Sequence, residues 1–124
     1  MPKKVLAIGI DPAFIDFNTM PQFSLEMFRS YIDSEIERFR ALGYDVEICL
    51  IDLGDTAEAM TTRALQSGEF DCVLIGAGLR QPRERLLLFE RILNLIHRHA
   101  PDASICFNTT PADSTKAVRR WIAA

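Results

Sequence analysis

The chain has 124 residues, 48% hydrophobic and 25% charged, a balance that fits one folded domain over residues 1–124 and leaves no room for a second. Its formal net charge is -3 with basic residues dispersed along the chain, which argues against a nucleic-acid partner, because such partners need a clustered basic face. The first apolar run ends at Asp11 and is too short for a signal-peptide core or a membrane span, so we expect a cytoplasmic protein with no membrane partner.

A strand is predicted over residues 3–10, where a continuous apolar run is typical of a parallel strand covered on both faces. The connection that follows, residues 12–23, is long for an α/β protein. It carries the large apolar residues Phe14, Ile15, Phe17, Met20 and Phe23. Two interpretations remain open: these side chains cap the core, or the segment covers a ligand or a partner subunit.

The first helix is predicted between Ser24, a suitable N-cap, and Gly43, a natural stop. Its charged residues, Glu35 among them, are expected to face solvent. Its buried face is expected to contain Leu25, Phe28, Ile32, Ile36 and Phe39.

The second strand is predicted over residues 44–53, and a short second helix follows it. Asp55 and Glu58 have the spacing of a capping box for that helix, and Gly68 is expected to end it.

The third strand, residues 71–75, is the predicted centre of the sheet and runs into a glycine-rich turn. Pro82 is well placed as the first residue of a third helix that continues to His99. The apolar residues of this helix cover nearly half its surface, whereas a surface helix needs a stripe of only about 100°. We therefore expect this helix to be wedged between neighbours or to form a dimer interface.

A fourth strand over residues 103–108 and a last helix over residues 115–123 complete the predicted elements. Asp113 or Ser114 can cap the last helix. Its buried side is expected to contain Ala117, Val118, Trp121 and Ile122.

The three cysteines, Cys49, Cys72 and Cys106, lie inside separate apolar runs, and no pair has C-x-x-C spacing. We interpret them as buried, reduced thiols that pack as small apolar side chains. Residues in the middle of separate strands seldom converge on a metal ion, so no metal site is predicted.

Strands that alternate with helices predict an α/β fold: a three-layer, flavodoxin-like or Rossmann-like open sheet of four parallel strands in the order 2-1-3-4, with helices on both faces. Strand 4 is then an apolar edge that must be protected. A homodimer through the third helix or through the strand-4 edge is the predicted assembly.

The segment Phe70-Asp71-Cys72-Val73-Leu74-Ile75-Gly76 resembles the third strand of response-regulator receiver domains, which often reads as an aromatic residue, Asp and an apolar run ending in the phosphorylated Asp. Asp11 resembles one of their metal-binding acids, and Thr109 or Thr110 falls where they keep a hydroxyl. The resemblance implies a flavodoxin-like fold. Because Gly76 occupies the phosphoacceptor position and no fifth strand with its lysine is predicted, phosphoryl acceptance by that route is not expected.

The carboxyl ends of the strands are the predicted working edge, as in other open parallel sheets. The candidate ligand-binding residues there are Asp11, Gly76, Gly78, Arg80, Asn108, Thr109 and Thr110. Two interpretations of the Gly-x-Gly turn beside an arginine are open: a site for a small anionic ligand, or a tight strand-to-helix turn whose arginines face solvent. Gln81 stands in place of the third glycine of the dinucleotide fingerprint. No nucleophile with its base is recognisable, so no catalytic residue is predicted and the sequence identifies no cofactor.

Two hypotheses about function follow from these patterns. The first is a non-catalytic, receiver-like interaction or regulatory module that acts as an oligomer. The alternative is a protein that binds a small polar or anionic ligand, or a minimal enzyme, with residues 12–23 as a lid over the strand edge. The sequence leaves open whether the chain is an enzyme.

Overall fold

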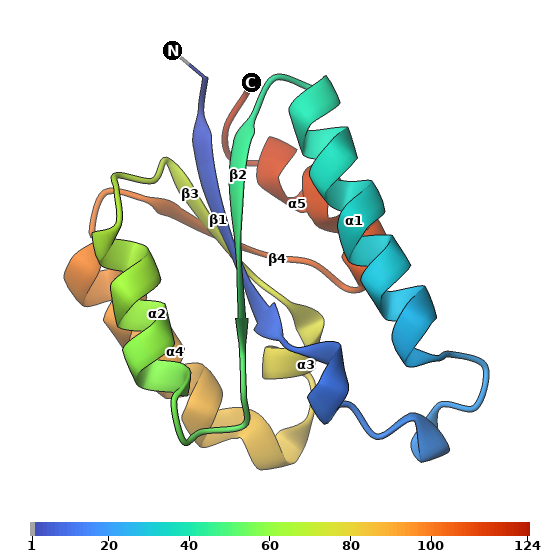
Figure 1. The fold of residues 1–124 in the computed structure, drawn as a ribbon. Coiled ribbons are helices and arrows are strands. Elements are labelled where there is room, and N and C mark those ends of the chain that lie inside the picture. Colours follow the sequence, from blue (N-terminus) through green and yellow to red (C-terminus); the bar gives the residue numbers. More distant parts are fainter. Residues whose placement is uncertain (1) are drawn as a thin grey trace.

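The computed structural model describes residues 2–124 and has one parallel sheet with helices on both faces (Figure 1). Its strands are β1 (Lys4–Ile10), β2 (Asp45–Ile51), β3 (Cys72–Ile75) and β4 (Ser104–Phe107). They are hydrogen-bonded in the order β2-β1-β3-β4, and every neighbouring pair is parallel. The predicted fold class and strand order are confirmed.

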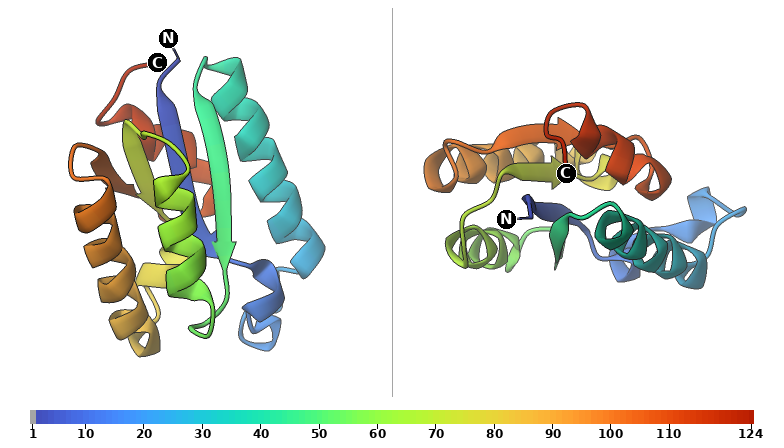
Figure 2. Two further views of the ribbon diagram at one scale, coloured as in Figure 1. Left: turned by 60° about the vertical axis from the view of Figure 1, so that its left-hand side comes forward. Right: turned by 90° about the horizontal axis from the view of Figure 1, so that it is seen from above.

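Helices connect successive strands and form the two outer layers. They are α1 (Leu25–Ala41), α2 (Ala57–Gln66), α3 (Ala77–Arg80), α4 (Leu86–His99) and α5 (Ser114–Arg119). Short 3-10 turns add η1 (Pro12–Phe14), η2 (Phe17–Thr19), η3 (Arg83–Arg85) and η4 (Pro111–Asp113). As Figure 2 shows, α1 and α5 lie on one face of the sheet and α2 and α4 on the other, which is the arrangement that right-handed crossovers impose on this strand order.

Each face of the sheet has its own core, because successive side chains of a strand point to opposite faces. In β1, Leu6 and Ile8 pack toward α2 and α4, whereas Val5 and Ala7 pack toward α1 and α5. The long apolar face of α4 contributes Leu88, Ile92 and Ile96 to the first core. Phe39, Tyr44, Ala117 and Val118 complete the second core.

The long connection between β1 and α1 packs mainly on α1. Phe17 and Phe23 contact Phe28 of that helix, with ring centroids 5.5 and 5.3 Å apart. Ile15 packs against the core on the α2 side, whereas Phe14 is 45% exposed. Most apolar side chains of the segment therefore fold back onto the protein, as the first interpretation expected, whereas Phe14 faces outward; cover for a ligand or a partner subunit stays a prediction.

The N-termini of two helices differ from the prediction. The capping box of Asp55 and Glu58 is wrong, because Thr56 is the N-cap of α2 and Asp52 accepts hydrogen bonds from the amides of Gly54 and Thr56 instead. Asp52 thereby stabilises the turn that precedes α2. The hydrogen bonds from Gly54 and Thr56 also lower the pKa of its carboxyl.

The third predicted helix begins later than expected. Pro82 is not the first residue of α4; it is the N-cap of η3, and α4 starts at Leu86. The preceding residues form the separate short helix α3, which buries Leu79 completely. Because α3 directly follows β3, it places the Leu79 side chain in the core at the carboxyl edge of the sheet.

Three side chains have exposures opposite to those predicted. Glu35 was expected in solvent and is only 5% exposed, whereas Leu25 lies outside the core. Trp121 was expected on the buried side of the last helix and is 61% exposed, because α5 ends at Arg119. The N-cap of α1 is Ser24 as predicted, and its hydroxyl accepts from the Met27 amide.

None of the helices in the described part of the chain has the length and apolar composition needed to cross a lipid bilayer.

Candidate functional site

The candidate residues all lie at the carboxyl edge of the sheet, where β1, β3 and β4 end, but they form three separate groups rather than one. The first group surrounds Asn108 and includes Gly76, Gly78 and Arg80, at and just before α3. The second joins Thr109 and Thr110 to Asp113, and the third contains Asp11.

Asn108 is the centre of the first group and is 5% exposed. Its Oδ1 accepts a hydrogen bond of 2.8 Å from the amide of Ala77, at the start of α3. Its Nδ2 donates to Oγ of Ser114, at the start of α5, over 3.0 Å. Both ends of the amide are thus used to hold the first turns of two helices against the end of β4, a structural role for a side chain that the sequence offered as a ligand contact.

Arg80 is held above the end of β4. Its Nη2 donates to the carbonyl of Asn108 over 3.0 Å, and the guanidinium lies 5.3 Å from the centroid of the Phe107 ring. This stacking is a favourable cation–π arrangement. The Nε atom is buried and has no hydrogen-bond partner among residues 2–124.

Gly76 and Gly78 have ordinary backbone conformations and are not required by crowding. Gly76 has a φ of -69°, and a Cβ there would lie 3.5 Å from the Ile8 carbonyl oxygen, an ordinary contact. A Cβ on Gly78 would meet Arg85 and Ile10 at 3.9 Å. The carbonyl of Gly78 accepts a hydrogen bond of 2.7 Å from Nη1 of Arg85. Arg85 is therefore directed at a backbone oxygen of the turn.

Asp11 faces away from this group, toward η1 and α1. Its Oδ1 accepts a hydrogen bond of 3.0 Å from the Ala13 amide and caps η1. The same oxygen lies 3.4 Å from Nη2 of Arg29 on α1. Asp11 thus caps a turn and pairs with a cation that the sequence interpretation did not single out.

Thr109 and Thr110 are tied to Asp113. The carboxylate of Asp113 accepts from the hydroxyl and amide of Thr109 and from the amide of Thr110. Burial alone would raise the pKa of the Asp113 carboxyl, but these hydrogen bonds together hold its pKa below the usual range. The Thr110 hydroxyl in turn accepts from the Ala112 amide, so that Thr110 and Asp113 form a capping box around η4.

Two residues matter for this edge in ways that sequence reasoning did not predict: Glu35 was expected in solvent, and Ser114 was considered only as a helix cap. Oε1 of Glu35, on α1, accepts hydrogen bonds from the amides of Ser114 and Thr115, at 3.0 and 3.4 Å. A side chain of α1 therefore caps the N-terminus of α5. Oε2 forms an ion pair of 3.1 Å with Arg38. A signal was present in the sequence, because Glu35 lies three residues after Ile32 and four before Phe39, on the apolar face of its helix.

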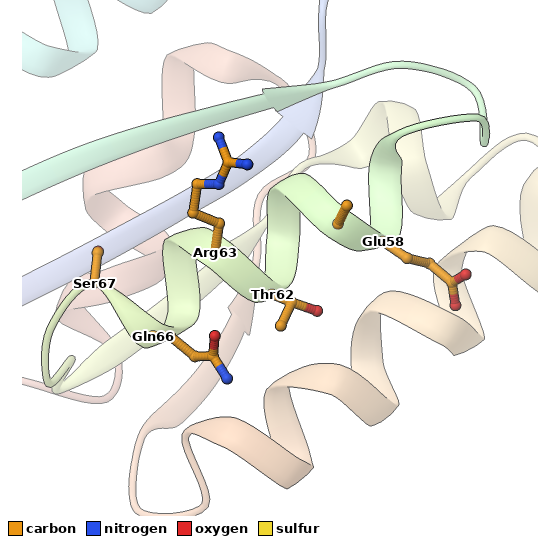
Figure 3. Close-up of a pocket in the computed structure, with 6 residues that line it drawn as sticks. Glu58, Thr62, Arg63, Gln66 and Ser67 are labelled. Atoms are coloured by element: carbon orange, nitrogen blue, oxygen red, sulfur yellow. The ribbon is translucent and has the colours of Figure 1, made fainter.

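Two surface depressions lie beside α2 and α4, and none of the candidate ligand-binding residues lines them. One is an open depression along α2, where Figure 3 shows Arg63 directed toward β2 and Glu58 toward the neighbouring helix. A second, with a volume of about 300 Å³, lies between Glu58 of α2 and one side of α4. The α4 residues that line it are Leu87, Glu90, Arg91, Asn94, Leu95 and Arg98.

Within residues 2–124, no three His, Cys, Asp or Glu side chains gather in a way that would hold a metal ion. No protein-family model matches the sequence, and no curated protein matches it.

Proposed function

We propose that the protein is a non-catalytic, receiver-like interaction module that associates with a second copy of itself through α4. The observation that carries the proposal is the pattern of exposed side chains on that helix. At the strand edge, Asn108, Thr109, Thr110 and Asp11 are engaged in hydrogen bonds that hold turns and helix ends. Because these polar groups are already hydrogen-bonded within the protein, they support a structural role for the carboxyl edge of the sheet. This favours the exposed side of α4 as the functional surface.

The exposed side of α4 combines a large apolar side chain with charges of both signs. We call Leu87, Glu90, Arg91, Asn94 and Arg98 the α4 surface. Leu87 is 67% exposed, the most exposed of the large hydrophobic residues in the described chain. The other four are also exposed and rim the hollow beside α2. An apolar residue within a mixed polar rim is the usual make-up of a protein interface.

The α4 surface is complementary to itself under a two-fold axis. Glu90, Asn94 and Arg98 are spaced four residues apart, so they lie along one row of the helix. Antiparallel packing of two α4 helices centred on Asn94 would bring Glu90 of each copy opposite Arg98 of the other. A two-fold interface always produces such contacts in pairs, and both pairs here join opposite charges.

The β4 edge is the weaker of the two expected interfaces. Its Phe107 carbonyl accepts a hydrogen bond of 3.0 Å from Nη2 of Arg120. An arginine that occupies a backbone acceptor of an edge strand hinders the addition of another strand there. This favours α4 over β4 as the site of association.

Sedimentation velocity over a range of protein concentrations tests the proposal. We expect a species of twice the 14.0 kDa chain mass to grow with concentration. Leu87→Asp is expected to shift the equilibrium to the monomer, whereas Leu42→Asp, at an exposed leucine on the α1 side, should leave it unchanged. A protein that remains monomeric at every concentration, or a Leu42→Asp effect equal to that of Leu87→Asp, would contradict the proposal.

A small anionic ligand at the strand edge is the second candidate, and the buried, unpartnered Nε of Arg80 favours it. A thermal-shift screen with nucleotides and sugar phosphates tests this function. A ligand at 100 times its Kd adds about 2.7 kcal/mol to the free energy of unfolding. A rise in Tm that is lost in Gly78→Ala, a change the fold itself has room for, would support ligand binding.

A further inference from the structure

Two of the three cysteines approach each other closely in the core. The Sγ atoms of Cys72 on β3 and Cys106 on β4 are 3.6 Å apart, and both residues are buried. The sequence interpretation of the cysteines as buried, reduced thiols is confirmed, but it did not foresee that two of them are in contact. Cys49, the third cysteine, belongs to the core on the other face of the sheet.

The strand register explains why the two thiols meet. Cys72 pairs with Ser104 and Leu74 pairs with Cys106, so the two cysteines are diagonal neighbours on adjacent strands. Because side chains two residues apart share a face, both thiols point toward the α1 and α5 side. There α5 packs over β3 and β4, with Ala117 and Val118 in the same core.

The environment distinguishes the two sulfurs chemically. A hydrogen bond between the thiols lowers the pKa of Cys72 and raises the pKa of Cys106, which burial raises further. The thiolate is the reactive form of cysteine, and the hydrogen bond from its neighbour favours the thiolate at Cys72. Cys49 has no such neighbour among the described cysteines, and burial raises its pKa.

We propose that Cys72 and Cys106 form an intramolecular disulfide when the folded protein meets hydrogen peroxide. A disulfide bond is about 2.05 Å long, so the sulfurs must close the gap between that length and their present 3.6 Å separation. Diagonal neighbours on adjacent strands lie about 7–8 Å apart at Cα, and bridged cysteines usually about 4.4–6.8 Å, so bond formation requires β3 and β4 to shift locally as well as the side chains to rotate. The bond would join β3 to β4 directly and close the loop that carries α3 and α4.

The reaction is balanced with peroxide as the only oxidant. The thiolate of Cys72 attacks one peroxide oxygen, the O–O bond breaks, and the departing hydroxide takes up a proton to become water. The resulting sulfenic acid is then attacked by the sulfur of Cys106. The S–O bond breaks, a second water leaves with the proton of Cys106, and the S–S bond remains.

Access to the pair is controlled by α5, which is a single short helix. Its first amides are held by Glu35, and the backbone after it is held where Tyr44 donates to the Ile122 carbonyl over 2.8 Å. Hydrogen peroxide is small enough to enter after a slight displacement of this cover. Oxidised glutathione is much larger and would need α5 to detach, so we expect it to react far more slowly.

Peptide mapping can test the proposal on the native chain without any variant. Trypsin places the cysteines on three different peptides: residues 41–63 carry Cys49, residues 64–80 carry Cys72 and residues 99–116 carry Cys106. The folded protein is exposed to peroxide, the peroxide is removed with catalase, and free thiols are alkylated in denaturant. We expect a cross-linked pair of peptides 64–80 and 99–116, alkylated Cys49, and reversal by dithiothreitol.

The controls separate a specific bond from general oxidation. Cys49→Ser should form the same cross-link, whereas Cys72→Ser and Cys106→Ser should form none. Three alkylated cysteines after peroxide treatment would overturn the proposal. A cross-link that includes Cys49, or sulfinic acid at Cys72 without any cross-link, would overturn it equally.

Discussion

Single buried polar side chains hold the short helices of this fold at the sheet edge. Glu35 joins α1 to the first amides of α5, and Arg38 donates to the Ala112 carbonyl just before that helix over 3.2 Å. Asn108 does the same for α3 and α5 from the end of β4. Helices as short as α3 and α5 have little stability of their own, so these contacts fix their positions.

Replacing Glu35 is expected to destabilise the protein markedly. Glu35→Ala leaves the buried amides of Ser114 and Thr115 without their acceptor, a loss of about 1–3 kcal/mol in the free energy of unfolding. Urea denaturation monitored by circular dichroism measures the change. The matched control is Glu37→Ala, whose exposed carboxylate pairs with Arg40 at 3.9 Å and should cost less than about 0.5 kcal/mol. Equal losses in both variants would refute the role of Glu35.

Asp113 should make stability depend on acid pH. Its pKa is lowered in the folded state, so its contribution is complete above the unfolded pKa of about 3.9 and is lost as the pH falls through the folded pKa. Asp113→Asn should lower the free energy of unfolding by about 1 kcal/mol at pH 7 and flatten its decline below about pH 4. Denaturation at a series of pH values measures this. Asp102→Asn, at an exposed turn, is the control, and identical pH profiles for all three proteins would count against the account.

At the scale of elements, α4 has a buried side that packs on the sheet and an exposed side that forms the proposed interface. Ile92 is completely buried against the sheet, whereas Leu87 is an exposed apolar residue of the proposed interface, about two turns before its centre at Asn94. Ile92→Ala should cost about 2–5 kcal/mol at any protein concentration. Leu87→Ala should change the stability of the monomer by less than about 0.5 kcal/mol. Thermal unfolding at low protein concentration compares them, and a large loss for Leu87→Ala there would show that this side belongs to the core.

The main elements could be predicted because their apolar periods are strong, while their ends depend on contacts made in the folded protein. The local sequence contains no signal that α5 ends at Arg119, because the apolar residues Val118, Trp121 and Ile122 continue a helical spacing. The chain leaves the helix where Ile122 meets Tyr44, and Trp121 is turned outward. The separate α3 was missed for a similar reason, because burial of Leu79 requires a turn that Pro82 alone does not indicate.

At the scale of the whole molecule, the topology was predictable because few alternatives exist. Continuous apolar runs require strands covered on both faces, and right-handed crossovers then leave the order β2-β1-β3-β4 with two helices on each face. The candidate site was predictable only in its position along the sheet edge. Which polar side chains turn inward there is decided by partners such as Ser114, six residues after Asn108, and Arg29, eighteen residues after Asp11, whose positions depend on how α5 and α1 pack.

The most direct measurement of the proposed association is a charge-exchange cycle at Glu90 and Arg98. Analytical ultracentrifugation gives the dimerisation constant of Glu90→Arg, of Arg98→Glu and of the double variant. Glu37→Arg on α1 is the control for the change in net charge.

Each single exchange creates two repulsive pairs across the two-fold axis, so we expect dimerisation to weaken by about tenfold or more. The double variant restores two attractive pairs and should return to within about threefold of the native value. Losses that add up in the double variant, or a control that weakens the dimer as strongly as the single exchanges, would contradict the antiparallel α4 pairing.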